Sequence, residues 1–214
     1  MGLELIVLKQ IIPLLLAVAL SGCFSTRTIE PPAPEMVDDV DVRPNAIAKV
    51  QIAEDVELTL PLMPGYPQDA LLFQTLVGRY DGRTRAFQAT LSLSPDRVEV
   101  VLLAPSGPRV MQLTWTEQGI EETRSNLAPE DLNGLNILAD IFLSTWPKQS
   151  VIDALPDNAV LLTGDGNREI WSGKQRLIDL EDGGVDEQGR KHARLTHVQR
   201  GYVLDIISED LNAE

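Results

Sequence analysis

Apolar and polar residues alternate through the middle of the chain, with the period of two that is typical of a β-strand with one buried face. The clearest run is residues 85–93, whose apolar members are Phe87, Ala89, Leu91 and Leu93. A second run, residues 71–77, places on one face Leu71, Phe73 and Val77. Runs of the same kind follow at residues 98–103, 111–115, 160–163, 170–171, 177–180, 194–198 and 202–207. The pattern predicts a meander of antiparallel strands.

The alternation is interrupted by a segment in which apolar residues recur every three or four positions, the spacing of an amphipathic helix. These residues are Leu135, Leu138, Ile141, Phe142 and Trp146. Pro129, followed by two acidic residues, favours a helix start, and Pro147 marks the end. Asp140 on the opposite face lies between Asn136 and Ser144, which favours a solvated or hydrogen-bonded carboxylate over a functional one. A strand meander with one helix predicts an α+β domain with a large antiparallel sheet.

The first 60 residues differ in composition from the rest. Residues 1–22 are largely apolar, and their uncharged stretch is shorter than the about 20 residues of a membrane-spanning helix, so we predict a signal peptide. Residues 23–60 contain several prolines and an excess of acids, which predicts an extended tether, although the alternation of Val56, Leu58 and Leu60 could form a first edge strand. Residues 61–214 are expected to form a single folded domain, because no internal repeat or second core-sized unit is evident.

The only cysteine, Cys23, follows Leu20-Ser21-Gly22 at the end of the apolar stretch. This segment resembles the lipobox of bacterial lipoproteins. The resemblance implies that the leader is removed and that Cys23 carries a diacylglycerol and a further acyl chain such as palmitate, which is enough for stable membrane attachment. Phe24, in place of aspartate, favours the outer membrane over retention in the inner membrane, with the domain facing the periplasm.

The charge balance and the lack of motifs narrow the classes of function. The chain has 32 acidic and 18 basic residues and a formal charge of -14, which excludes nucleic acid as the partner. A single cysteine excludes a disulfide within the chain and a multi-cysteine metal site. His192 and His197 point to opposite faces if both lie on one strand, and both are expected at the surface. With no nucleophile elbow, phosphate loop or dinucleotide motif, we predict no catalytic residue, metal, cofactor or enzymatic activity.

Residues 136–147, Asn-Ile-Leu-Ala-Asp-Ile-Phe-Leu-Ser-Thr-Trp-Pro, resemble the central motif of a family of bacterial lipoproteins of unknown function. Members of that family are similar to the lipoprotein-localisation proteins LolA and LolB. The resemblance covers about residues 65–210, including Phe87-Gln88 and the strand at 201–206. It implies an incomplete antiparallel barrel, curved around one main helix and short helices, whose apolar interior accepts acyl chains. It also implies lipid or lipoprotein transport, with fatty-acid-type or aryl-polyene products as ligands and envelope transport proteins as partners.

The lining of such an interior would come from the apolar residues on the inner faces of the predicted elements. The strands would contribute Phe73, Phe87, Leu91, Leu102, Met111, Leu113 and Trp115, and the helix Leu138, Phe142 and Trp146. Trp146 could gate the mouth of a cavity, but its place before Pro147 favours packing on the sheet. The same residues would equally fill an ordinary core. The leading function is therefore an outer-membrane lipoprotein that binds a lipid-like ligand, and the alternative is a structural or scaffolding lipoprotein with a filled core.

Overall fold

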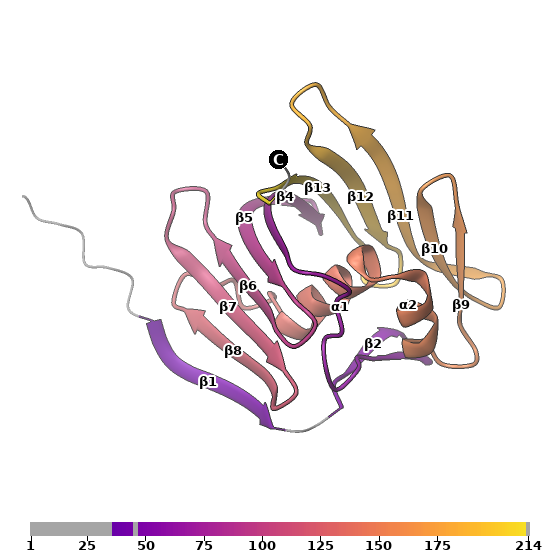
Figure 1. Cartoon of the computed structure of the whole chain (residues 1–214), viewed down its shortest axis with the longest axis horizontal. Helices are drawn as coiled ribbons and strands as arrows, with labels where there is room; N and C mark the ends of the chain where they lie inside the picture. Colours follow the sequence, from indigo (N-terminus) through magenta and orange to yellow (C-terminus); the bar gives the residue numbers. More distant parts are fainter. Residues whose placement is uncertain (1–35, 45–46, 213–214) are drawn as a thin grey trace, which may run out of the picture. The chain divides into compact units, whose positions relative to one another are not determined.

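The structure is a computed structural model that describes residues 36–44 and 47–212 (Figure 1). The predicted signal peptide at 1–22, the lipidation site Cys23 and the first part of the tether lie outside the described residues. Among the described residues, eleven strands form one antiparallel sheet in the order β1-β8-β7-β6-β5-β4-β13-β12-β11-β10-β9. The sheet is open rather than closed, because β1 and β9 are its two edges.

The strands of this sheet are β1 (Met36–Pro44), β4 (Ala70–Tyr80), β5 (Arg83–Leu93), β6 (Val98–Leu103), β7 (Arg109–Thr116), β8 (Gly119–Ser125), β9 (Val160–Gly164), β10 (Asn167–Ser172), β11 (Gln175–Val185), β12 (Lys191–His197) and β13 (Tyr202–Asp210). Two shorter strands, β2 (Lys49–Ala53) and β3 (Val56–Thr59), form a separate hairpin. The helices are α1 (Gly134–Thr145) and α2 (Lys148–Ala154). Each alternating run predicted from residue 71 onward overlaps one of these strands, so the large antiparallel sheet predicted from the sequence is present.

The folded part of the chain begins before residue 61. Strand β1 pairs with β8, and the β2–β3 hairpin buries Val50, Ile52, Val56 and Leu58 in the core. The segment predicted as a tether, residues 23–60, therefore includes elements of the domain. The physical reason is that a few alternating apolar residues suffice to dock a short hairpin on a core that other segments build, even where the surrounding sequence is acidic.

Helix α1 begins at Gly134, five residues later than the position that Pro129 indicates. The side-chain oxygen of Asn133 accepts a hydrogen bond from the backbone N–H of Asn136 at 3.1 Å and so caps the first turn. The Arg124 guanidinium donates to the carbonyls of Pro129 and Leu132, at 2.8 and 2.6 Å, and holds the preceding residues as a turn. The helix ends where predicted, because Trp146 adopts extended backbone angles before proline.

The apolar side of α1 packs on the part of the sheet around β7, where Trp115 meets Phe142 and Leu113 lies beside Gly134. Leu138 and Phe142 are buried there, and four aromatic rings meet. The centroid of the Trp146 ring lies 5.8 Å from that of Trp115, 5.2 Å from that of Phe142 and 4.9 Å from that of Tyr66. This half of the inner face, the face that α1 covers, is a closed core. Neither helix in the described part of the chain has the length and hydropathy to cross a bilayer.

Candidate functional site

A hollow of about 590 Å³ lies between α1 and the strands β4, β5, β6 and β13. Ligand pockets in proteins measure about 300–1,000 Å³, so the hollow can hold a small molecule or a lipid tail. Its apolar wall consists of Leu76, Phe87, Ala89, Leu91, Val100, Leu102, Leu204 and Ile206 from the sheet and Leu132, Ile137 and Ile141 from the helical segment. Polar side chains, at least as numerous as the apolar ones, complete the lining, so the hollow combines an apolar wall with polar and charged groups.

The hollow exists because α1 turns its less apolar side toward this half of the sheet. Asn136, Asp140 and Ser144 line the hollow together with two isoleucines, while Leu138 and Phe142 on the other side fill the core. The opposing strands present Gly78 and Ala89, which have little or no side chain to occupy the gap. The helix face that the sequence indicates as solvated thus faces an internal space.

The ten predicted lining residues are divided between three places. Phe87, Leu91 and Leu102 line the hollow. The closed core contains Met111, Leu113, Trp115, Leu138, Phe142 and Trp146. Phe73 lies on the opposite face of the sheet, since side chains alternate along a strand and its neighbours Gln74 and Leu76 face the hollow. Strand periodicity identifies an inner face but does not reveal whether a neighbouring element fills the space above it.

Strand β4 is the one whose inner face differs from the prediction. The sequence favours Leu71, Phe73 and Val77 as the inner set, whereas the structure places the even-numbered residues inside. Apolar residues occupy both odd- and even-numbered positions of this strand, so alternation alone does not decide which face is buried. The register with β5, in which Leu76 pairs with Phe87, decides the face. The lining residue Leu76 was missed for this reason. Leu204, on β13, faces the hollow beside Gly78, with which it pairs.

Asp140 is, with Asp131, one of the two aspartates that line the hollow. Its side chain accepts a hydrogen bond from the Tyr202 hydroxyl, and the Arg200 guanidinium lies close enough to act on both groups. Burial raises the pKa of Asp140 to about 6, although the Tyr202 hydrogen bond and the charge of Arg200 act in the opposite direction. Burial and the neighbouring Asp140 charge raise the pKa of Tyr202 far above its usual value, so the phenol stays protonated.

The raised pKa of Asp140 makes stability depend on pH. The folded state holds this proton up to a pH of about 6, whereas an unfolded aspartate releases it near its ordinary value of 3.8. Folding is therefore penalised as the pH rises through this window, by about 2–3 kcal/mol in total. We expect Asp140→Asn, which still accepts from Tyr202, to gain stability relative to the native chain between pH 4 and pH 7, as measured by urea unfolding at each pH.

The control for this prediction is Asp131→Asn. Asp131 is exposed, and its hydrogen bond with Arg85 lowers its pKa, so its ionised form contributes stability that is lost as the pH falls through its folded pKa. Relative to the native chain, Asp140→Asn should gain stability as the pH rises from 4 to 7. Asp131→Asn should instead lose stability as the pH rises through the range in which Asp131 ionises. Parallel pH profiles for Asp140→Asn and the native chain would contradict the assignment.

One end of the hollow is rich in arginine. Register pairing of Tyr80 with Tyr202 brings the β4–β5 hairpin beside the turn between β12 and β13. Arg83 and Arg85 from the hairpin and Arg200 from the turn all line the hollow at this end. We call this end, defined by these three residues, the arginine mouth.

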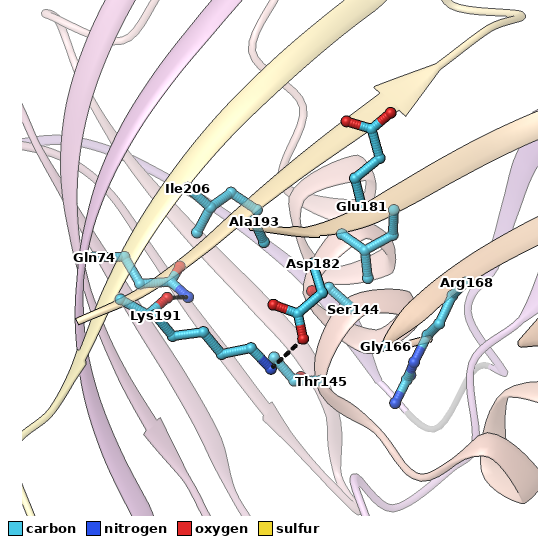
Figure 2. Close-up of a pocket in the computed structure, with 12 residues that line it drawn as sticks. Gln74, Ser144, Thr145, Gly166, Arg168, Glu181, Asp182, Lys191, Ala193 and Ile206 are labelled. Carbon is cyan, nitrogen blue, oxygen red and sulfur yellow. Dashed lines mark hydrogen bonds and ion pairs between the residues drawn. The ribbon is translucent and has the colours of Figure 1, made fainter. Parts of the chain in front are cut away.

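The other end of the hollow adjoins a small polar pocket of about 130 Å³ (Figure 2). The two spaces share Gln74, Ser144 and Ile206 in their linings. Gln74 donates a hydrogen bond to Ser208 at 2.9 Å, and Lys191 approaches Asp182 at 4.0 Å, the two interactions drawn in Figure 2. Ser144, Thr145 and Arg168 in this pocket donate to backbone carbonyls, and the hydrogen-bonded Gln74 marks the boundary between the pocket and the apolar hollow.

The two histidines do not form a site. His192 lies 2.9 Å from the Asp186 carboxylate on the outer face of β12. His197 is fully buried on the inner face against Tyr202, so the expectation that it lies at the surface was wrong. Burial and the charge of Arg200 lower its pKa to about 3 and keep the imidazole neutral. Among the described residues, no three histidine, cysteine or acidic side chains gather in a way that could hold a metal ion.

Comparison with known proteins gives a family. A search of the curated proteins found no match. A family model described as "Protein of unknown function (DUF3261)" matches residues 72–210, which is about two thirds of the chain. The matched part includes every residue that lines the hollow. Since the match exceeds half of the chain, this protein belongs to the family described as Protein of unknown function (DUF3261).

Proposed function

We propose that this protein is a non-enzymatic outer-membrane lipoprotein that binds an acyl chain or a similar lipid-like ligand in the hollow beneath α1. It would pass that ligand to or from the membrane or another envelope transport protein. The observation that carries the proposal is the hollow itself, with about 590 Å³ of space and a largely apolar wall. Each methylene group moved from water into such a space contributes about 0.8 kcal/mol, so the hollow favours an alkyl chain.

The open sheet and the position of α1 support a half-barrel arrangement similar to that of LolA and LolB. The scaffolding alternative requires a filled interior, and the aromatic cluster around Trp146 fills one half of the inner face in that way. The other half contains the hollow. A lined internal space serves a carrier, whereas a scaffold gains stability from filling it. The hollow therefore favours the carrier.

Photochemical labelling tests the carrier function. The full chain, purified from its own envelope and returned to phosphatidylcholine vesicles, is irradiated with a fatty acid that carries a diazirine near the end of its chain. We expect saturable cross-links on peptides that contain Leu91 and Ile137, and their loss when unlabelled fatty acid is added. Cross-links confined to peptides that do not line the hollow would contradict the proposal.

The membrane anchor is tested separately. Mass spectrometry of the amino-terminal peptide should find Cys23 as the first residue, with a diacylglyceryl group and an additional acyl chain. A Cys23→Ala chain should no longer fractionate with the outer membrane. If it still does, the anchor lies elsewhere.

A further inference from the structure

The inner positions of β5 change in character along the strand. Leu91, Ala89 and Phe87 give an apolar wall, and the next two inner positions toward the hairpin are Arg85 and Arg83. This order follows from the alternation of side chains along a strand. One wall of the hollow is therefore itself amphiphilic, apolar inside and cationic at the arginine mouth.

The charges of the arginine mouth are incompletely neutralised. Arg85 forms an ion pair with Asp131, whereas Arg83 makes no hydrogen bond or ion pair with any described residue. Arg200 donates through Nη2 to the carbonyl of Gln51 at 2.7 Å, but its Nη1 atom is buried and has no acceptor among the described residues. A buried charged donor without an acceptor is unfavourable, and a ligand oxygen could remove that penalty.

Few acidic groups face these three cations. Asp131 pairs with Arg85 and also lies within electrostatic reach of Arg83, and Asp140, hydrogen-bonded to Tyr202, lies within electrostatic reach of Arg200, so two carboxylates face three guanidinium groups. Arg79, which also borders the hollow, is held by Asp205. The chain has a formal charge of -14, so a local excess of positive charge at the end of the hollow contrasts with the charge of the chain as a whole.

We propose that the ligand is an amphiphile with an anionic headgroup, a carboxylate or a phosphate, held at the arginine mouth by Arg83 and Arg200. Its alkyl chain lies along Phe87, Ala89 and Leu91. The inference rests on the proposed carrier function and adds the chemical class of the ligand. Guanidinium groups bind carboxylate and phosphate oxygens through paired, charge-assisted hydrogen bonds, whereas an ammonium headgroup would be repelled and a neutral ester would offer only an uncharged carbonyl acceptor.

Competition against the photoreactive fatty acid tests this inference on the full chain in phosphatidylcholine vesicles. The competitors share one chain length and one concentration in the bilayer: hexadecanoate, hexadecyl phosphate, methyl hexadecanoate and hexadecylamine. We expect each anionic competitor to be about tenfold more effective than the ester or the amine. The ratio between hexadecanoate and hexadecyl phosphate then identifies which anionic headgroup is preferred.

Charge variants connect the effect to the mouth. Arg83→Gln should weaken competition by the anions about fivefold and Arg83→Glu more strongly, while competition by the methyl ester stays unchanged. Arg97→Gln and Arg97→Glu are the controls, because Arg97 is also an exposed arginine but pairs with Glu99 and does not line the hollow. Anions and ester that compete equally, or Arg83 variants that behave like the native chain, would overturn the headgroup inference and leave the carrier function standing. No labelling of the hollow by any probe would overturn both.

Discussion

Replacing Trp146 with alanine is expected to lower the free energy of unfolding by about 4 kcal/mol. The Trp146 side chain is 1% exposed and lies against the rings of Trp115, Phe142 and Tyr66. Its indole N–H donates to the carbonyl of Pro64 at 2.6 Å, inside the core. The substitution removes ring contacts, leaves a cavity and deprives a buried carbonyl of its donor, and these three effects add. Urea unfolding of the full chain, followed by far-ultraviolet circular dichroism, measures the loss.

Two further variants separate these effects. Trp146→Phe retains a ring but removes the donor to Pro64, so a loss of about 1–3 kcal/mol is expected. Trp171→Ala changes a half-buried tryptophan of β10 outside the aromatic cluster and should cost about 1 kcal/mol. Equal losses for Trp146→Ala and Trp171→Ala would show that the cluster does not hold α1 on the sheet.

Filling the hollow from Gly78 is expected to reduce labelling by the photoreactive fatty acid about tenfold and to leave the fold intact. A Cβ atom at Gly78 would meet only the Arg85 carbonyl oxygen and a methyl group of Leu204, both at 3.9 Å, which is ordinary van der Waals contact. Gly78 lies within strand β4, where an aromatic residue is favoured over glycine. The phenyl ring of Gly78→Phe would therefore occupy space that the alkyl chain needs. Cross-link yield on peptides of the hollow, at equal probe concentration, measures the effect.

Gly164→Phe is the matched control for this plug. Gly164 also lies on a strand, β9, and nothing approaches a Cβ atom there within 4 Å, but β9 is an edge of the sheet and does not line the hollow. It should be labelled like the native chain. Unchanged labelling of a folded Gly78→Phe protein would mean that the ligand binds elsewhere.

Asp140 shows where reasoning from a helical pattern reaches its limit. The positions of Asn136, Asp140 and Ser144 on one side of α1 indicate a polar face, and this side is indeed distinct from the side that carries Leu138 and Phe142. A polar face is normally assigned to solvent. Here the partner of Asp140 is Tyr202, 62 residues away in the chain, and no local pattern can indicate such a pairing. The arginine mouth likewise joins two turns that are distant in sequence.

The sequence by itself determined the strands from residue 71 onward, the main helix and the end of that helix, because alternation, helical spacing and proline act over a few residues and report on which side of an element is apolar. It also placed Phe87, Leu91 and Leu102 on an inner face. Only the tertiary structure decided what lies opposite that face. The register of β4 on β5, the docking of the β2–β3 hairpin and the direction in which α1 turns its two sides fill one half of the interior and leave the other half hollow. Space between elements depends on the volumes of side chains that are far apart in the chain, and such volumes meet only in the folded protein.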